Sequence, residues 1–327
     1  MISKTNILVV GGAGYIGSIC VEELLNAGHR ITVYDNLAEG HRSAVDSRAT
    51  FVLGHPEQEG DILKSVKDAR PEAIMHFAAN ALVGESMTNP KKYFHNNVIT
   101  SLKLLDAAVE VGVKKFVFSS TCATFGPPDR VPITEDTPQR PISPYGESKL
   151  MVEKILRWYQ RIYGLEFIAF RYFNAAGASK KFGEHHRIET HLIPCVLKVA
   201  LGQSPHCEIY GSDYPTPDGT CIRDYVHIVD LAQAHMLGLH PGKAGFYNLG
   251  NGDGYSVRQV IAACEKISGK KIPTVEKPRR PGDPPRLVAS AEKAVRELGW
   301  KPKYPKLEDS VATAWAWHEQ HPNGYPD

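Results

Sequence analysis

The chain has 327 residues, of which 42% are hydrophobic and 23% charged, and its formal net charge is +2. This composition is typical of a globular protein, and the near-neutral charge gives no reason to expect nucleic acid or an anionic membrane as a partner. The short apolar run near the N-terminus stops at glycine, so we expect neither a signal peptide nor a membrane span. The six cysteines include no Cys-x-x-Cys pair, which predicts free thiols and a cytoplasmic location.

The first predicted elements are a strand, a glycine-rich turn and a helix. Residues 7–10 are a continuous apolar run, as in a parallel strand buried on both faces. Gly11, Gly12, Gly14 and Gly17 follow, and apolar residues then recur at helical spacing up to Gly28. Glycines let the backbone approach a diphosphate, and the N-terminus of the following helix supplies free N–H groups and positive potential.

The next predicted strand, residues 30–35, ends in Asp35. This acid lies about 20 residues after the glycines, where a carboxylate accepts a hydrogen bond from a ribose 2′-hydroxyl. The same carboxylate would repel a 2′-phosphate. The strand, turn, helix and terminal acid together predict a site for NAD rather than NADP.

Strands and helices then alternate along the chain. Further strands are predicted at 50–54, 73–79, 115–120 and 166–173, with helices such as 97–111 and 147–163 between them. This rhythm predicts an α/β fold with a doubly wound parallel sheet of the Rossmann type. Ligands of such sheets bind at the carboxyl ends of the strands. We therefore expect residues 76–79, 119–121 and 172–174 around one cleft.

The stretch SPYGESK, residues 143–149, has the pattern of a helix start. Ser143 suits the N-cap position and Pro144 the first helical position. Tyr145 and Lys149 are then four residues apart and lie on one face of the helix. The sequence predicts a phenol and an ammonium side by side, facing the same cleft.

Residues 1–174 are expected to form the NAD-binding domain, and residues 175–327 a smaller α/β domain that binds the substrate. The segment at about 224–245 is expected to return to the first domain, with a helix over 224–239 capped by Asp230 and Gln233. The run EHHRIETH, 184–191, has no helical H-x-x-x-H pair with a third ligand, so it predicts a solvated loop and no metal site.

Several longer motifs match one family over nearly the whole chain. They include GGAGYIGS, HFAA, FSSTCATFG, SPYGESKLMVEK, RYFNAAGA, HLIP, DGTCIRDYVHIVDLA and RRPGD. The chain resembles the extended short-chain dehydrogenase/reductase family, and within it the UDP-galactose 4-epimerases. The resemblance implies tightly bound NAD, reversible 4-epimerisation of UDP-galactose and UDP-glucose through a 4-keto sugar, and a homodimer formed by helices 97–111 and 147–163. It leaves UDP-N-acetylhexosamines open as further substrates.

The resemblance also implies roles for individual residues. Tyr145 would be the catalytic base, Lys149 would lower the pKa of its phenol, and Thr121 would bridge the phenol and the sugar O4. The implied cofactor contacts are Gly11, Gly14, Tyr15, Ile16, Gly17, Asp35, Asn36, His55, Phe77, Ala78, Ala79, Asn97, Ser119, Tyr145, Lys149 and Tyr172. The implied substrate contacts are Thr121, Asn174, His191, Leu192, Tyr210, Arg223, Tyr225, Arg280, Asp283 and Leu287.

Three positions depart from the family pattern. Counting back from HFAA without a gap puts His55 where the family has an Asp beside the adenine, whereas a six-residue slip gives Asp61. We favour His55, because the slip would leave the following helix too short. Ala81 stands where some members have a Lys near the cofactor phosphates. His191 stands where others have Asn, and an imidazole still hydrogen-bonds a diphosphate.

Other functions fit the residues less well. A nucleotide-sugar 4,6-dehydratase needs an acid pair beside Thr121, but Cys122 and Ala123 follow it. A 3,5-epimerase/reductase needs a Cys and a His there, and no His neighbours Cys122. The alternatives left open are another NAD-dependent nucleotide-sugar epimerase or dehydratase, such as a UDP-uronate or UDP-pentose 4-epimerase, and a non-catalytic NAD sensor.

Overall fold

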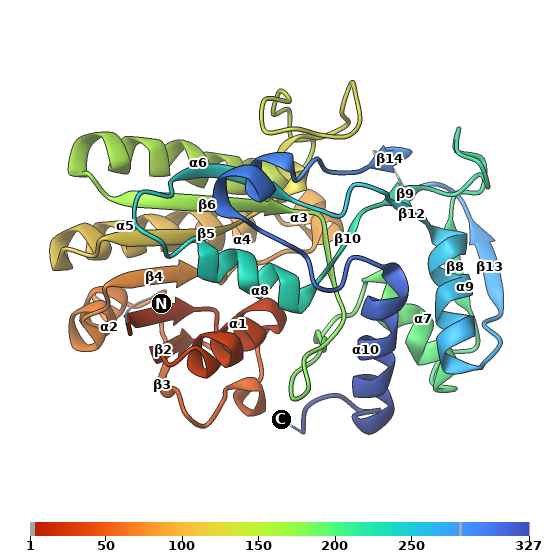
Figure 1. The fold of residues 1–327 in the computed structure, drawn as a ribbon, viewed down its shortest axis with the longest axis horizontal. Coiled ribbons are helices and arrows are strands. Elements are labelled where there is room, and N and C mark those ends of the chain that lie inside the picture. Colours follow the sequence, from red (N-terminus) through yellow and green to blue (C-terminus); the bar gives the residue numbers. More distant parts are fainter. Residues whose placement is uncertain (1–3, 281–282, 327) are drawn as a thin grey trace.

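Seven parallel strands form the central sheet in the computed structural model, which describes residues 4–280 and 283–326 (Figure 1). Their order across the sheet is β11 (Gly245–Leu249), β6 (Glu166–Tyr172), β5 (Lys115–Thr121), β4 (Ala73–His76), β1 (Asn6–Val10), β2 (Arg30–Asp35) and β3 (Thr50–Leu53). The strand order reverses at β1, which lies between β4 and β2. The predicted doubly wound parallel sheet is confirmed.

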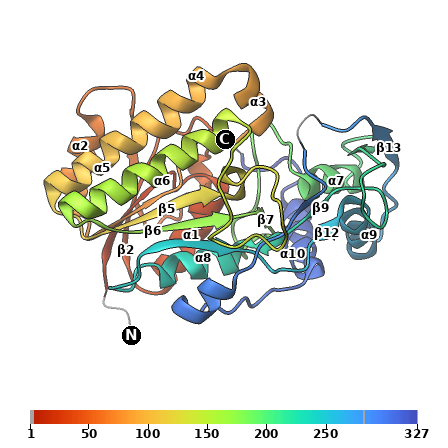
Figure 2. The same cartoon turned by 90° about the horizontal axis from the view of Figure 1, so that it is seen from above.

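Helices cover both faces of this sheet, as Figure 2 shows. One face carries α1 (Tyr15–Asn26) and α8 (Ile228–Leu237), and the other carries α2 (Asp61–Ala69), α5 (Thr100–Val111) and α6 (Pro144–Tyr163). The side chains of β1 explain why both faces need cover. Ile7 and Val9 are buried in the core on the α1 side, whereas Leu8 and Val10 are buried on the α5 side.

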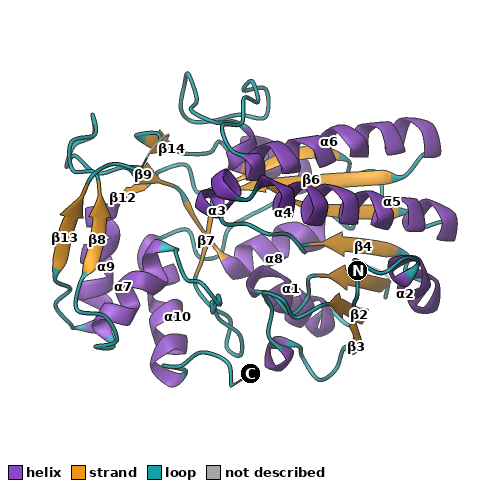
Figure 3. Cartoon of the chain, turned by 180° about the vertical axis from the view of Figure 1, so that it is seen from behind, coloured by secondary structure: helices purple, strands orange, loops and turns teal. Residues whose placement is uncertain are grey.

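The smaller part of the chain lies at the carboxyl ends of the sheet strands (Figure 3). Its helices are α7 (Leu192–Ala200), α9 (Val257–Ser268) and α10 (Leu307–Gln320). Its strands pair as β8 (Cys207–Tyr210) with β13 (Thr274–Lys277), as β7 (Asn174–Ala176) with β10 (Tyr225–His227), and as β9 (Ile222–Arg223) between β12 (Tyr255–Ser256) and β14 (Arg286–Leu287). The helices pack on one another around a separate apolar core.

Shorter helices join these elements. They are α3 (Val83–Thr88), α4 (Pro90–Tyr93), the π-helices Phe94–Ile99 and Ala294–Leu298, and the 3-10 helices Arg42–Ala44 and Cys122–Thr124. The helix predicted over 97–111 therefore starts earlier, because α4 runs through the π-helix into α5. None of the helices in the described ranges is long and apolar enough to cross a membrane.

The predicted start of α6 is confirmed. Ser143 is the N-cap, its hydroxyl accepts the Gly146 N–H at 3.2 Å, and Pro144 is the first helical residue.

The helix predicted over 224–239 is wrong in its first residues. Residues Tyr225–His227 form β10 instead, and α8 begins at Ile228 with His227 as its N-cap. The His227 ring accepts the Val229 N–H at 3.1 Å. Asp230 does not cap this helix, because its carboxylate accepts the N–H groups of Lys303 and Tyr304 at 2.7 and 2.8 Å. The predicted capping box therefore does not form, because the Asp230 side chain binds the backbone of Lys303, 73 residues away.

The segment after β10 rejoins the large sheet. α8 packs beside α1, and β11 pairs with β6 at the edge of the sheet, where Phe246 lies opposite Ala169. The boundaries of the two domains stay a prediction.

Candidate functional site

The glycine-rich turn after β1 is shaped by close backbone contacts. Gly11 has φ +85°, and a Cβ on Gly17 would lie 2.1 Å from the Gly11 oxygen. The following helix α1 begins at Tyr15 with Gly14 as its N-cap, without a side-chain cap and without an acidic residue in its first turn. Its first N–H groups are therefore available to an anion, and this turn fits the diphosphate of a dinucleotide.

Asp35 lies beside this turn, at the end of β2. One carboxylate oxygen accepts the Ala13 N–H and the other accepts the Leu37 N–H, both at 2.9 Å. Burial raises the pKa of Asp35, although these two hydrogen bonds lower it. The side chain is fixed against the turn, and each oxygen keeps a lone pair for a ribose hydroxyl. Asn36 follows it and accepts the Ala38 N–H at 3.1 Å.

The segment after β4 forms the opposite wall. A Cβ on Gly11 would lie 2.4 Å from the Ala78 nitrogen, so the two loops are in contact. Phe77, Ala78, Ala79 and Ile16 are each partly exposed beside the turn. Asn97 stabilises this segment through its side-chain amide. The amide oxygen accepts the Asn80 N–H at 2.9 Å, and the amide nitrogen donates to the Asn80 backbone oxygen and to the Ser148 hydroxyl, both at 3.0 Å.

The Tyr15 phenol points away from the glycine turn. Its hydroxyl donates to the Gly177 oxygen at 2.7 Å, and burial raises its pKa well above the ordinary value. Tyr15 therefore joins α1 to the loop after β7.

The premise for preferring His55 over Asp61 is wrong. Helix α2 begins at Asp61, so assigning this acid to the site shortens no helix. The Asp61 carboxylate accepts both the His55 N–H at 2.9 Å and the Tyr34 hydroxyl at 2.7 Å. The structure thus brings His55 and Asp61 together at the ends of β2 and β3.

The phenol, ammonium and hydroxyl expected to act on the sugar meet at the ends of β5 and α6. Thr121 ends β5, and its hydroxyl accepts the Ala123 N–H at 3.1 Å. Lys149 donates to the Ser119 oxygen at 2.9 Å, and its Nζ lies 4.9 Å from the centre of the Phe118 ring. The Tyr172 hydroxyl contacts the Ser119 hydroxyl from the neighbouring strand.

Burial shifts the proton affinities of Tyr145 and Lys149. It raises the pKa of Tyr145 to about 12, although a hydrogen bond with Thr121 lowers it. It lowers the pKa of Lys149 to about 7, although the charge of Glu153 raises it. The Thr121 hydroxyl is thus a neighbour that favours the phenolate. The expected effect of Lys149 on the pKa of Tyr145 stays a prediction.

On the smaller part of the chain, the guanidinium groups of two arginines contact neighbouring side chains. Arg223 forms an ion pair with Asp283 and donates to the Ile222 oxygen at 2.8 Å. Arg280 lies 4.1 Å above the centre of the Tyr210 ring. A guanidinium held in this way loses little freedom when it binds a phosphate.

Other expected substrate residues surround these arginines. Asn174 donates to the Asp224 oxygen at 2.8 Å, and Tyr225 is buried one residue further on. Leu287 in β14 pairs with Arg223 in β9. Leu287 and Cys122 pack against the same apolar cluster, and Cys122 follows Thr121. Leu287 thus lies on the side of the smaller part that approaches Thr121.

The loop at 184–191 is solvated only in part, which corrects the expectation: Arg187, Ile188, Thr190 and His191 are exposed, but the side chains of its two glutamates are not. The side chains of Glu184 and Glu189 are only 5% and 3% exposed. His191 Nδ1 lies 2.8 Å from Glu184 and 3.3 Å from Glu189, and His186 Nε2 lies 3.2 Å from Glu184. Although burial lowers the pKa of His191, the two carboxylates raise it to about 10.

The same four side chains each offer one ligand atom within 4.8 Å of the others, and they are the one group in the described ranges that could hold a metal ion in this way. Their atoms already bond one another, and one Glu189 oxygen also accepts two backbone N–H groups. The cluster fixes His191 directly before Leu192, the first residue of α7.

Comparison with known proteins then identifies the family. The model described as the NAD dependent epimerase/dehydratase family matches residues 7–250. The chain belongs to this family. Its fold, with a dinucleotide turn and a paired tyrosine and lysine at the same strand ends, agrees with that membership.

Relatives that match this epimerase/dehydratase chain over nearly its full length include UDP-glucose 4-epimerases. The UDP-glucose 4-epimerase of Halalkalibacterium halodurans is 50% identical over 326 residues, covering 98% of this chain and 97% of that protein. A crystal structure of a UDP-glucose 4-epimerase matches with a TM-score of 0.95 and 48% identity, covering 98% and 99% of the two chains. The Bifidobacterium longum UDP-glucose 4-epimerase, solved with NAD⁺ and UDP, matches with a TM-score of 0.93 and 39% identity, covering 98% and 99%.

One buried residue next to Lys149 on α6 was missed in the sequence. Glu153 is buried on α6, four residues after Lys149, and both of its oxygens bind Arg171 of β6, at 2.9 and 2.7 Å. Tyr145, Lys149 and Glu153 occur at i, i+4 and i+8. This spacing predicts that all three lie on one helix face, so Glu153 could have been found from the sequence.

Proposed function

We propose that the protein interconverts UDP-galactose and UDP-glucose with a tightly bound NAD. The observation that carries this proposal is the buried group of Thr121, Tyr145 and Lys149 beside a glycine turn that fits a dinucleotide. The full-length similarity to UDP-glucose 4-epimerases supports the same reaction.

The cofactor would be held along the ends of β1, β2 and β4. The N–H groups that open α1 bind its diphosphate, and Asp35 accepts from a ribose hydroxyl. Lys149 and Tyr172, which both contact Ser119, would hold the nicotinamide end of the cofactor. A bound nicotinamide ring supplies a reversible acceptor for the hydrogen at C4 of the hexose.

The chain itself handles the O4 proton. Tyr145 would accept this proton in its phenolate form, which the hydrogen bond with Thr121 favours, while the C4–O4 bond of the sugar becomes a carbonyl. The Thr121 hydroxyl would align O4 with the phenol. The 4-keto sugar then turns and takes its hydrogen back on the other face, while Tyr145 returns the proton to O4. The burial of Tyr145 excludes water from this exchange.

The UDP group would be bound by the smaller part of the chain. Arg223 and Arg280 offer planar donors that pair with diphosphate oxygens bidentately. Asp283 and Tyr210 hold these two guanidinium groups. Leu192 opens α7, whose N-cap His191 provides no side-chain cap, so backbone N–H groups there are available to an anion.

We also propose the expected arrangement of the chain. Residues 1–174 with the returning segment would bind NAD, and the rest of 175–327 would bind the nucleotide sugar. The protein would act as a cytoplasmic homodimer that pairs through α5 and α6.

A coupled assay on dialysed protein tests the proposed reaction. UDP-galactose should be converted to UDP-glucose without added NAD, because the cofactor is reoxidised in every cycle. The reverse reaction should occur with the same protein. Bound dinucleotide without turnover would favour an NAD sensor, and strict dependence on added NADPH would reject the proposal.

A further inference from the structure

The strand order places two charged side chains on opposite sides of the dinucleotide turn. β1 lies between β4 and β2, and the glycine turn follows β1. Glu39 comes from the loop after β2, and Lys92 comes from α4, which follows β4. Because the carboxyl ends of parallel strands lie at the same edge of a sheet, a contact between these residues must pass over the end of β1.

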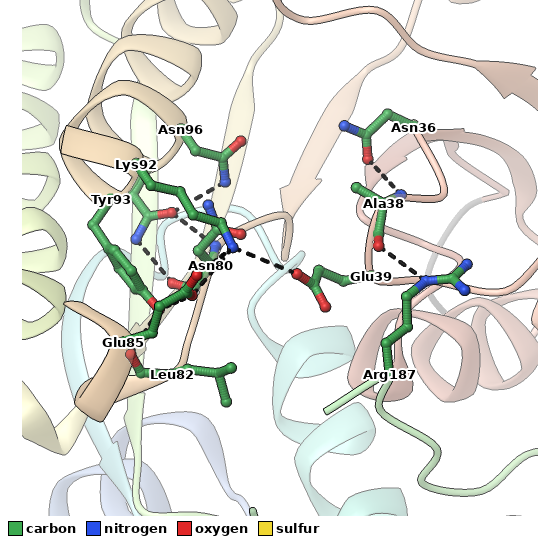
Figure 4. Close-up of polar contacts among 11 residues, drawn as sticks. Asn36, Ala38, Glu39, Asn80, Leu82, Glu85, Lys92, Tyr93, Asn96 and Arg187 are labelled. Carbon is green, nitrogen blue, oxygen red and sulfur yellow. Dashed lines mark hydrogen bonds and ion pairs between the residues drawn. The ribbon is translucent and has the colours of Figure 1, made fainter. Parts of the chain in front are cut away.

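Such a contact exists. Lys92 Nζ lies 4.0 Å from a Glu39 carboxylate oxygen, and Figure 4 shows the lysine extending from its helix toward the glutamate across the intervening space. Both side chains are partly exposed, at 36% and 49%, so the pair lies at the surface of the protein.

The lysine is held at its own wall. Its Nζ donates to both oxygens of Glu85 in α3, at 2.8 and 3.1 Å. Glu85 also accepts the Tyr93 hydroxyl at 2.8 Å, which ties α3 to α4. Lys92 therefore reaches over the groove from an anchored position.

The loop that carries Glu39 is held from the other side. Arg187, from the loop after β7, donates to the backbone oxygens of Ala38, Leu37 and Gly40 at 3.0, 3.1 and 3.2 Å, and Figure 4 shows it below this loop. A Cβ on Gly40 would lie 2.8 Å from the Ala13 backbone, so the loop also packs on the glycine turn. Both ends of the contact thus belong to fixed segments.

We propose that the Lys92–Glu39 pair is a latch over the dinucleotide groove, and that it slows release of the cofactor. This rests on the proposed function, since a diphosphate at the start of α1 would lie beneath the pair. The cofactor leaves only when the two walls separate, and separation breaks this ion pair. The Lys92 ammonium also adds positive potential above the diphosphate.

Exchange of bound NAD tests the latch without measuring turnover. Protein carrying its NAD is mixed with excess isotopically labelled NAD, and the bound fraction is followed by rapid gel filtration and mass spectrometry. Lys92→Ala and Glu39→Ala should each speed exchange by about 2- to 5-fold, the range for a partly exposed ion pair. Salt at about 1 M should speed exchange in the wild type toward the Lys92→Ala rate, because it screens the pair.

Matched variants separate the latch from other effects. The double variant should exchange no faster than either single variant, because each removes the same contact. Lys91→Ala, at the neighbouring exposed lysine, should exchange at the wild-type rate, and Lys92→Arg should restore slow exchange.

Three results would overturn the latch. The latch would be overturned if both single variants exchanged NAD at the wild-type rate. It would also be overturned if the double variant exchanged NAD faster than either single variant by the product of their two effects. Fast exchange in Lys92→Ala alone would assign the effect to a lysine–cofactor contact instead. Purified protein that retains no dinucleotide at all would overturn the proposed function together with the latch, whereas the first three results leave that function intact.

Discussion

At the residue scale, burial determines how Tyr145 and Lys149 hold their protons. Burial raises the pKa of the phenol to about 12 and lowers that of the ammonium to about 7. Both shifts have the same cause, because a low-dielectric site disfavours the charged form of either group. Thr121 and Glu153 offset these shifts in the directions that favour phenolate and ammonium.

Tyr145→Phe should lower the turnover number by about 10² to 10⁴, because the proton acceptor is lost while the apolar ring is kept. The dinucleotide should remain bound, and its content after denaturation can be measured by absorbance. Tyr159→Phe is the matched control, since this tyrosine lies on the same helix but bonds Asp106. A nearly wild-type rate in Tyr145→Phe would reject the assignment of the base.

Lys149→Met should change how stability depends on pH. The folded chain loses the Lys149 proton above about pH 7, whereas the unfolded chain keeps it to about pH 10.4. The unfolded state therefore binds more protons in this window, and the free energy of unfolding rises with pH by about 1.4 kcal/mol per pH unit. Urea unfolding at both ends of the window should show that wild type gains stability relative to the variant as pH rises; a constant difference would contradict the shift.

Leu287 should allow UDP-N-acetylgalactosamine as a second substrate. By family resemblance this position walls the space beside the C2 substituent of the sugar, and a compact leucine leaves more room than a tyrosine. Leu287→Tyr should reduce turnover of UDP-N-acetylgalactosamine relative to UDP-galactose by about 10- to 200-fold, the range for shape discrimination in an apolar pocket. An unchanged ratio of the two rates, or wild type without detectable action on the N-acetyl sugar, would show that Leu287 is not the gate.

At the element scale, a buried ion pair ties α6 to the sheet behind Lys149. Arg171 of β6 binds Glu153 of α6, and both side chains are 2% exposed. Ser120 of β5 donates to the same carboxylate at 2.6 Å, and Gln139 donates at 2.9 Å. Helix and sheet are thus fixed relative to each other next to the reacting groups.

Arg171→Met should destabilise the fold by about 3–5 kcal/mol, because it leaves the Glu153 carboxylate buried without its cation. Chemical unfolding of the single variant and of Arg171→Met/Glu153→Met measures the effect. The double variant should regain much of the loss, since no buried charge remains. If the wild type and the single variant had equal free energies of unfolding, the Arg171–Glu153 ion pair would not be formed in solution.

At the scale of the whole molecule, α5 and α6 leave an apolar outer face. The two helices lie side by side on one side of the sheet (Figure 2), and Trp158 and Ile162 of α6 are 58% and 63% exposed. Leu102 of α5 and Ile99 of the preceding π-helix are 38% and 42% exposed. Large apolar side chains gathered on one face are typical of a protein interface.

Trp158→Glu should therefore shift the proposed dimer to monomers, because the new charge would be buried in the proposed interface. Light scattering after gel filtration measures the molar mass. Val275→Glu, at an exposed valine on β13, should leave the mass of the wild type unchanged. A wild-type molar mass of one chain would show that there is no dimer. A Trp158→Glu variant that remains a dimer would show that the interface lies elsewhere.

The sequence by itself determined the features that depend on neighbours in the chain. The apolar run, glycines and helical spacing of residues 7–28 predicted β1, its turn and α1, and the alternation of such units predicted the parallel sheet. The spacing of Tyr145 and Lys149 determined their common helix face. These patterns are local, because strand and helix periods act within a few residues.

Only the tertiary structure decided features that depend on distant partners. Asp230 lost its predicted capping role to backbone groups 73 residues away, and Arg223 met Asp283 across 60 residues. Glu184 and Glu189 became buried although their run of charged residues predicts a solvated loop. Burial and charge pairing depend on which segments the fold brings together, so neither they nor the pKa shifts of Tyr145 and Lys149 follow from sequence spacing.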